Sequence, residues 1–284
     1  MRFMLTGAAG QLGSTIVRRF SDDEVVAFTR QQLDITNEPA TLRAATTARP
    51  DVVINCAAFN DVDGAEQQAQ AALEVNAFGV LSLARAARAV DAVFVHYSTD
   101  FVFDGEADRP YTETDATAPA STYGASKLLG EWFAGDGQRV YVLRVESLFG
   151  GSPAKSSVDK ILKAIQRREP ARVFVDRTVT PSYVEDVAGA TASLIAASAP
   201  FGLYHCVNSG MTTWLGVGEE ISRLLGVQAQ LIPIRVDDVQ LLARRPKYCA
   251  LSNEKLRMLG IVMPAWQDAL ARHVSRLLAQ GFGL

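Results

Sequence analysis

The stretch MRFMLTGAAGQLGSTIV, residues 1–17, places Gly7, Gly10 and Gly13 at intervals of three between an apolar run and a helical pattern. The apolar run predicts a buried strand, and the pattern after it predicts an amphipathic helix. The N-terminus of a helix presents unpaired N–H groups and a partial positive charge, which attract phosphate. Glycines let a pyrophosphate approach the backbone closely. The context therefore predicts a phosphate-binding turn, and the alternative is a turn without a ligand.

The first half of the chain repeats this alternation of apolar runs and helical patterns. The predicted strands cover residues 2–7, 24–29, 51–58, 92–99 and 140–145, and the predicted helices cover residues 11–21, 65–90 and 123–134. The strand runs are continuously apolar, as in strands whose two faces are both covered by helices. The alternation predicts an α/β fold, a Rossmann-type doubly wound parallel sheet with right-handed crossovers.

The rhythm of the sequence changes after about residue 146. Strand-like runs at 171–175 and 202–207 are mixed with loops and with helical patterns near 214–226 and 252–260. We expect residues 1–146 to form a cofactor-binding Rossmann domain that strands from the later half complete. Residues 147–284 are expected to form mainly a smaller α/β substrate-binding lobe, interleaved with the sheet.

The composition is that of an ordinary globular protein. The 284 residues are 48% hydrophobic and 21% charged, with a net charge of −3. Positive charge is not in excess, so we expect no nucleic-acid partner. No apolar run approaches the roughly 20 residues that span a bilayer. We expect a cytoplasmic protein, since the sequence starts without a signal-peptide layout. The scattered cysteines and histidines predict no metal cluster, and they predict buried free thiols at Cys56 and Cys206.

A second group of polar residues follows the fourth predicted strand, which ends in HYSTDFVFDG, residues 96–105. Tyr123 and Lys127 come later in YGASK and share one face of a predicted helix. Tyr123 would donate its phenolic proton to a carbonyl oxygen as hydride reaches the carbon, and Thr99 would orient that oxygen. Lys127 would lower the phenol pKa from its usual value of about 10 and bind the nicotinamide ribose. A surface Tyr–Lys pair is the alternative, but the conjunction with the glycine turn favours an active site.

The spacing G-x-x-G-x-x-G resembles that of the short-chain dehydrogenase/reductase superfamily, particularly its extended, sugar-nucleotide-modifying branch. In the general pattern an acidic residue after the second strand binds the ribose 2′-hydroxyl of NAD. Here that strand is followed by Arg30, whose guanidinium suits a 2′-phosphate, so we expect NADPH, with NADH as the alternative. Arg30 could also be a solvated loop charge. With the resemblance, the expected cofactor-binding residues are Gly7, Gly10, Gln11, Leu12, Gly13, Arg30, Asp34, Ile35, Ala57, Ala58, Phe59, Tyr97, Tyr123 and Lys127.

Longer segments resemble the dTDP-4-dehydrorhamnose reductases over nearly the whole chain. RPDVVINCAAFNDVDGAE (49–66) is similar to RPDVVINAAAYTAVDKAE, VHYSTDFVFDG (95–105) to VHYSTDYVFDG, and YGASKLLGE (123–131) to YGKSKLAGE. RRPKYCALSNEKL (244–256) resembles PRPANSRLDTSKL. The resemblance implies reduction of the C4 ketone of dTDP-4-dehydro-β-L-rhamnose to dTDP-β-L-rhamnose by NADPH or NADH. It implies catalytic roles for Thr99, Tyr123 and Lys127, and substrate contacts from Thr99, Asp100, Phe101, Ser147 and Arg245.

Two segments depart from the family's pattern. RVESLFG (144–150) stands where the family has RTSWVYG, so Ser147 replaces a Trp that lines the sugar site and Glu146 adds a carboxylate. DRTVTPSY (176–183) stands where the family has DQxGxPT, so Arg177 appears. The residues of the chemistry are kept while residues that shape the substrate site are changed, which fits a reductase whose sugar differs from rhamnose.

Three alternatives to the rhamnose-forming reductase follow. The chain could be another nucleotide-sugar ketoreductase, an epimerase of the same branch, or a non-catalytic NADP-binding regulatory subunit of the methionine adenosyltransferase β type. Some relatives bridge a dimer through Mg²⁺, but Thr15 occupies one of their acidic positions, so we expect no metal. A homodimer is an open expectation, since no interface can be identified from the sequence.

Overall fold

The computed structural model describes residues 1–281 and is built around one parallel sheet. Six strands pair in the order β10-β5-β4-β3-β1-β2, and every pairing is parallel. These strands are β1 (Arg2–Thr6), β2 (Glu24–Phe28), β3 (Val52–Asn55), β4 (Val93–Thr99), β5 (Val140–Val145) and β10 (Gly202–His205). The predicted α/β class and the predicted doubly wound parallel sheet are confirmed.

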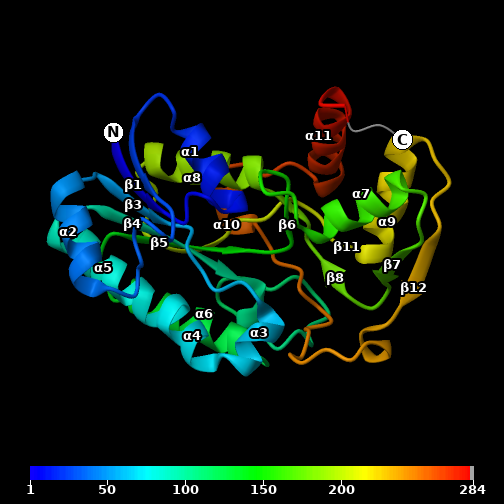
Figure 1. The fold of residues 1–284 in the computed structure, drawn as a ribbon, viewed down its shortest axis with the longest axis horizontal. Helices are drawn as coiled ribbons and strands as arrows, with labels where there is room; N and C mark the ends of the chain where they lie inside the picture. Colours follow the sequence, from blue (N-terminus) through cyan, green and yellow to red (C-terminus); the bar gives the residue numbers. More distant parts are fainter. Residues whose placement is uncertain (282–284) are drawn as a thin grey trace.

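Helices cover both faces of this sheet (Figure 1). Phe3 and Leu5 of β1 point into a core shared with one helix layer, and Met4 between them points into a second core on the other face. This alternation is the period of a strand that is buried on both sides. The first layer contains α1 (Gln11–Arg19) and α8 (Val184–Ala196), and the second contains α2 (Glu38–Ala48), α5 (Gly79–Ala89) and α6 (Thr122–Gly135).

The strand order fixes where a ligand can bind. The neighbours of β1 are β2 on one side and β3 on the other, so the chain leaves β1 in one direction and β3 in the opposite direction. Ligands of doubly wound sheets bind beyond the carboxyl ends of the strands at such a switch point. The glycine turn follows β1 directly, and it therefore lies at this position.

The predicted helix over residues 65–90 is wrong as a single element. The segment forms α3 (Val62–Gln67), α4 (Ala69–Leu73), the π-helical turn η1 (Glu74–Phe78) and α5. In the widened turn the Asn76 amide turns inward, accepts from the Phe59 N–H at 2.8 Å and donates to the Phe59 carbonyl at 3.1 Å. Asn76 also donates to Ser126 of α6 at 3.0 Å. The π-turn thus anchors the segment after β3 against the helix that carries Tyr123.

The later half of the chain forms a lobe beside the sheet and also supplies parts of the sheet layer. Strands β7 and β12 pair in parallel and pack with α7 and α9, on the right of Figure 1. The sixth strand β10 and the helix α8 come from this half but belong to the sheet layer. The lobe elements are α7 (Ser157–Gln166), β7 (Ala171–Phe174), α9 (Trp214–Leu225), β12 (Leu231–Ile234) and α11 (Trp266–Ala279), whereas the short helix α10 (Glu254–Met258) packs against β10 of the sheet.

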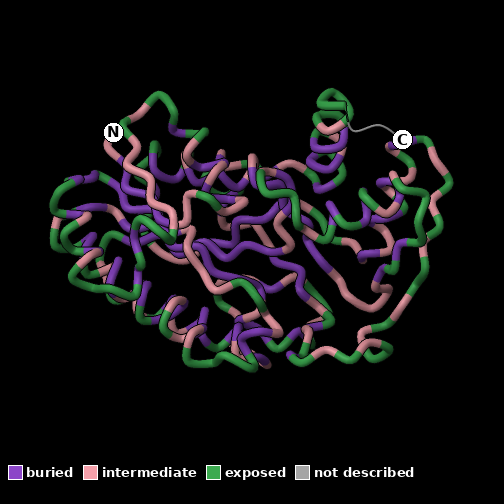
Figure 2. The backbone as a smooth tube through the Cα atoms, viewed as in Figure 1, coloured by how far each residue is buried: buried purple, intermediate pink, exposed green. Residues whose placement is uncertain are grey.

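Short elements join these layers, and the layers determine which residues are buried. The sheet and the facing sides of its helices are buried, whereas the outer helix faces are exposed (Figure 2). Among the described residues, no helix is both long enough and apolar enough to span a membrane. The short elements are β6 (Leu148–Phe149), β8 (Thr178–Val179), β9 (Ser182–Tyr183), β11 (Thr212–Thr213), and the 3-10 turns η2 (Asp100–Val102) and η3 (Val236–Asp238).

Candidate active site

A cavity of about 620 Å³ lies at the carboxyl ends of β1, β3, β4 and β5. It receives the glycine turn on one side and the first turns of α6 on the other. The structure therefore brings most of the predicted site residues together, although they are spread over nearly 140 positions of sequence. Those that line the cavity are Gly10, Gln11, Leu12, Gly13, Ala57, Ala58, Tyr97, Thr99, Asp100, Phe101, Tyr123, Lys127 and Ser147.

The glycine turn is packed so tightly that side chains are excluded from it. Gly7 has a φ of +76°, and a Cβ there would lie 2.6 Å from the Ala57 nitrogen. A Cβ on Gly13 would lie 2.1 Å from the Gly7 carbonyl oxygen. Within the described residues, no side chain caps the first N–H groups of α1, which begins at Gln11. These unpaired donors at the cavity wall fit the pyrophosphate of a dinucleotide.

Five predicted cofactor residues lie outside the lining of this cavity, and one of them is Gly7 of the close-packed glycine turn. Arg30 is exposed after β2 and forms no ion pair within residues 1–281. Asp34 accepts hydrogen bonds from Thr36, which hold its pKa below the ordinary value. Ile35 is buried in the core, and Phe59 packs beside Tyr123. The roles of these residues remain predictions.

Tyr123 is held close to the end of β4 by the start of α6. The hydroxyl of Ser121 caps the helix by accepting from the Gly124 N–H at 3.1 Å. Gly124 allows a close approach, because a Cβ there would lie 2.2 Å from the Phe101 carbonyl oxygen. The Phe101 ring contacts the Tyr123 ring edge-on at 5.5 Å, and Thr99 hydrogen-bonds the phenol. The Tyr123 and Thr99 hydroxyls thus face the same position in the cavity, where both could hydrogen-bond one carbonyl oxygen.

The pKa of Tyr123 differs from our expectation. Burial raises it above the ordinary value and the nearby Asp100 raises it further, while the hydrogen bond from Thr99 lowers it. Lys127, expected to lower it, donates instead to the Tyr97 carbonyl oxygen at 2.6 Å, and burial lowers its own pKa to about 8. Tyr123 is therefore a protonated phenol, which is the form that a proton donor in a reduction requires.

The side chain of Tyr97 points away from the point where Tyr123 and Thr99 meet. Its hydroxyl lies 2.7 Å from the Thr191 hydroxyl of α8, and its carbonyl receives the Lys127 bond. Tyr97 thereby positions Lys127 through its backbone while its side chain ties β4 to α8. Of the two thiols predicted to be buried, Cys206 is buried, but Cys56 is only partly buried and lines the cavity.

Sequence reasoning flagged Glu146 and Arg177 as departures but did not place them together. One oxygen or sulfur atom from each of Asp100, Glu146 and Cys249 lies within 4.8 Å of the others, and all three residues are buried. The Arg177 guanidinium donates to the Cys249 sulfur at 3.3 Å and to the Pro246 carbonyl at 3.1 Å. Because a fixed guanidinium already supplies positive charge here, the cluster does not fit a cation site. Nothing in the sequence indicated this cluster, because Asp100, Glu146 and Cys249 lie far apart along the chain.

The two carboxyl groups of this cluster resist carrying two charges. Burial raises the pKa of Asp100 to about 6, against the lowering influence of Arg177 and Thr99. Burial and the neighbouring Asp100 raise the pKa of Glu146 to about 8. Within the described residues, Asp100 Oδ2 and Ser98 Oγ are buried without a hydrogen-bond partner. Both residues line the cavity, and orphaned polar atoms at such a place fit a bound ligand.

The cavity also contains residues that sequence reasoning missed. Lys155, Ser156 and Lys160 come from the loop before α7 and from its first turns, and Trp214 comes from the start of α9. Ammonium groups at this wall suit the phosphates of a nucleotide ligand. Lys155 lies in the glycine- and serine-rich run GGSPAKSS, residues 150–157. Because this run has neither a helical nor a strand period, the sequence did not indicate that Lys155 would face the cavity.

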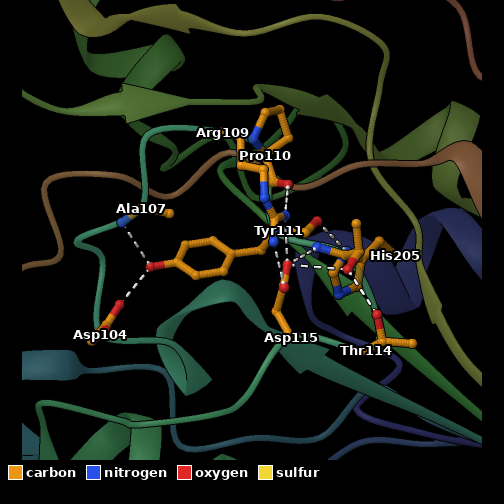
Figure 3. A network of polar contacts seen from close by, with 9 residues as sticks. Asp104, Ala107, Arg109, Pro110, Tyr111, Thr114, Asp115 and His205 are labelled. Atoms are coloured by element: carbon orange, nitrogen blue, oxygen red, sulfur yellow. Dashed lines mark hydrogen bonds and ion pairs between the residues drawn. The ribbon is translucent and has the colours of Figure 1, made fainter.

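Hydrogen bonds and an ion pair brace the loop after η2 (Figure 3), and Asp104 and Ala107 of this loop line a neighbouring hollow. The hydroxyl of Tyr111 donates to Asp104 at 2.6 Å and accepts backbone N–H groups, including that of Ala107 at 3.2 Å. Arg109 forms a bidentate pair with Asp115, at 2.9 and 2.8 Å. These contacts fold the loop onto itself and hold the segment after Thr99 in place.

Arg245, expected to contact substrate, lines a neighbouring hollow of about 710 Å³ instead. Its guanidinium pairs with Asp63 of α3 at 2.6 Å. Asp176 and Thr178 line the same hollow, on either side of Arg177, which lines the main cavity. The two hollows are therefore adjacent, and a long ligand could extend from one to the other.

Comparisons with known proteins give the family. The RmlD substrate binding domain family matches residues 1–279. This chain belongs to that family. It is 35% identical to a dTDP-4-dehydrorhamnose reductase of Burkholderia thailandensis, over 99% of this chain and 100% of the relative. It is 33% identical to a dTDP-4-keto-6-deoxy-D-glucose reductase of Streptomyces niveus, over 100% of this chain and 97% of the relative.

Solved structures agree with the relatives. A dTDP-4-dehydrorhamnose reductase from Clostridium acetobutylicum superposes with a TM-score of 0.94 at 35% identity, covering 98% of this chain and 100% of that one. The Bacillus anthracis enzyme of the same name, in complex with NADP, gives 0.93 at 31% identity, covering 97% and 99%. The resemblance seen in the sequence is confirmed.

Proposed function

We propose that this protein uses NADPH to reduce the C4 ketone of a dTDP-4-dehydro-6-deoxyhexose, with dTDP-4-dehydro-β-L-rhamnose as the substrate. The observation that carries the proposal is the convergence of Tyr123, Thr99 and Lys127 beside the glycine turn in one cavity. The family and the names of its members give the same reaction class. A purely regulatory NADP-binding role would require neither the Tyr123 phenol nor the Thr99 hydroxyl at that point.

In this proposal the glycine turn and Lys127 hold the cofactor. The unpaired N–H groups at the start of α1 bind the pyrophosphate, and the Lys127 ammonium binds the nicotinamide ribose. Arg30, exposed after β2, would bind the 2′-phosphate. NADPH, when bound, supplies the hydride that reaches C4.

The chain's own residues manage the proton. Thr99 and Tyr123 both hydrogen-bond the ketone oxygen and polarise it. As negative charge grows on that oxygen, Tyr123 transfers its phenolic proton to it and becomes a phenolate. Lys127, buried and charged below its pKa of about 8, is positioned by its bond to the Tyr97 carbonyl oxygen to bind the nicotinamide ribose beside this phenolate.

A second candidate is reduction of a different dTDP-4-keto-6-deoxy sugar. Ser147 occupies the position of the family's Trp and leaves a hydroxyl in the cavity lining, beside Glu146 and Arg177. These polar groups favour a sugar with more hydrogen-bonding groups at that side than rhamnose requires. The S. niveus relative shows that sequences this similar carry reductase names for another sugar.

The test is NADPH oxidation with enzymatically generated dTDP-4-dehydro-L-rhamnose and with other dTDP-4-keto-6-deoxyhexoses. We expect absorbance loss in the wild type and at least about a thousandfold slower loss in Tyr123→Phe, which removes the proton donor and little volume. NMR of the product identifies the sugar. NADPH binding without oxidation of any of these substrates would contradict the proposal and favour the regulatory role.

The same proposal places the protein in the cytoplasm, where NADPH and nucleotide sugars are available. Assembly as a homodimer remains a prediction. Light scattering of the purified chain tests it directly.

A further inference from the structure

The proton that Tyr123 gives to the substrate must be replaced, and the structure contains a chain of groups that leads to it. The phenol hydrogen-bonds Thr99, and the Thr99 hydroxyl lies 3.0 Å from Asp100 Oδ1. The other oxygen, Asp100 Oδ2, is buried and has no hydrogen-bond partner among the described residues. Asp100 is 5% exposed, so this atom is not satisfied by bulk water.

Glu146 provides a second acid close to the Asp100 carboxyl group. It lies within the same 4.8 Å cluster as Asp100 and is 2% exposed. Its carboxylate is held from both sides, since it accepts from the Thr180 N–H at 2.6 Å and from the Ser147 hydroxyl. Glu146 is therefore fixed in position beside Asp100 and cannot swing away from it.

The surroundings set the charge of the pair. Arg177 approaches both carboxyls, and the Cys249 thiol, whose pKa burial raises well above its ordinary value, stays neutral. Two buried carboxylates facing one guanidinium carry a net negative charge, and one added proton makes the group neutral. The pKa values of about 6 for Asp100 and about 8 for Glu146 give this one-proton state near neutral pH.

We propose that Asp100 and Glu146 share a single proton and pass it through Thr99 to the Tyr123 phenolate after each reduction. The Glu146 O–H bond breaks as its proton moves to Asp100, the Asp100 O–H bond breaks as an O–H bond forms on Thr99, and the Thr99 hydroxyl proton moves to the Tyr123 oxygen. The pair is left with two negative charges, which Arg177 stabilises until a proton from water restores it. Glu146 is a positioning residue in this scheme, because it acts on Tyr123 only through Asp100 and Thr99.

This proposal rests on the proposed reductase function, so its test has one readout without substrate. Infrared difference spectroscopy between pH 5 and 9 detects a protonated carboxyl directly. We expect a carboxyl band in the wild type that is lost with an apparent pKa near 8, and that Glu146→Gln does not show. Asp268→Asn, which changes an exposed carboxylate on α11 bound by Arg272, is the matched control and should leave the band unchanged. Absence of a protonated carboxyl at pH 7 in the wild type overturns the proposal.

The second readout is the pH profile of kcat. In Glu146→Gln we expect the falling limb to move from about pH 8 to about pH 6, the pKa of Asp100, and Glu146→Asp to return it toward 8. Lys127 also titrates near pH 8, but a limb set by Lys127 alone would not move in Glu146→Gln. An unmoved limb in a folded Glu146→Gln overturns the transfer to Tyr123. If no sugar is reduced, the proposed function fails, but the infrared titration still shows whether Asp100 and Glu146 share a proton. If Glu146→Gln does not fold, the infrared titrations of the wild type and of Asp100→Asn answer the same question.

Discussion

Replacing Gly13 by Ala tests whether the glycine turn is a close-packed phosphate site. Gly13 lies inside α1, where an alanine is conformationally favoured and would by itself stabilise the helix by about 1 kcal/mol. Its new Cβ, however, would lie 2.1 Å from the Gly7 carbonyl oxygen and 2.9 Å from the Gly7 carbonyl carbon. Both are backbone atoms, so α1 must retreat by about 1 Å from the turn.

The higher helix propensity of alanine and the clash of its Cβ with the Gly7 backbone have opposite effects on stability, but only the clash affects cofactor binding. Overpacking against fixed atoms costs about 1–3 kcal/mol, so the net destabilisation of Gly13→Ala is at most about 2 kcal/mol. The retreat also moves the first N–H groups of α1 away from the pyrophosphate. A hydrogen bond to a charged group contributes about 1.5–3 kcal/mol, so losing one weakens NADPH binding by about 10- to 150-fold.

Gly189→Ala is the matched control. Gly189 also lies inside a helix, α8, and apart from its chain neighbours and the backbone of α8 no atom of the described residues lies within 4 Å of where its Cβ would be. It should raise the free energy of unfolding by up to about 1 kcal/mol and leave NADPH affinity unchanged. Fluorescence titration with NADPH and thermal unfolding measure both quantities. NADPH affinity in Gly13→Ala within twofold of the wild type would refute the close-packed turn.

Three further predictions concern buried charge. Burial holds the pKa of His205 at about 3, so the folded protein does not bind the proton that His205 binds in the unfolded chain below pH 6.5. The free energy of unfolding should therefore be highest above pH 6.5 and fall by about 2–3 kcal/mol by pH 4.5. Urea titrations of His205→Gln should show a shallower fall over the same pH range. Glu131→Gln breaks the buried bidentate pair with Arg144, at 2.8 and 2.7 Å, and should lower the free energy of unfolding in urea titrations by about 3–5 kcal/mol; an unchanged value would contradict a stabilising role for the pair. Arg177→Gln leaves two buried carboxyls without a counter-charge and should cost about 3 kcal/mol; in a double-mutant cycle Glu146→Gln should recover part of this cost, and strict additivity would contradict the coupling.

The convergence of Thr99, Tyr123 and Lys127 could be predicted from the sequence because their arrangement follows from local rules. The carboxyl ends of parallel strands meet at one edge, so Thr99 at the end of a strand had to face that edge. The i, i+4 spacing put Tyr123 and Lys127 on one helix face. Each inference needed only the period of one element and the edge of one sheet, and the structure places all three side chains in the same cavity.

The parts that could not be predicted depend on contacts between distant segments. The broken helix after β3 arises because Asn76 turns inward to bind Phe59 and Ser126, and no periodicity in an alanine-rich run reveals that. Helices α2, α7, α8 and α11 were not predicted, and α8 carries few charges and many small residues. The approach of Cys249 to Asp100 joins positions that are about 150 residues apart.

The two departures from the family's pattern are physically one change. Glu146 adds a second buried acid beside Asp100, and two charges on this pair without a counter-charge would be costly. Arg177 supplies a counter-charge from a separate segment, and its guanidinium is fixed by Pro246 and Cys249. A serine and a glutamine at these positions, as in the family's pattern, would need no such compensation. Because these groups line the cavity where a sugar would bind and also contact the acid next to Thr99, a substitution that alters sugar choice here must alter proton supply as well.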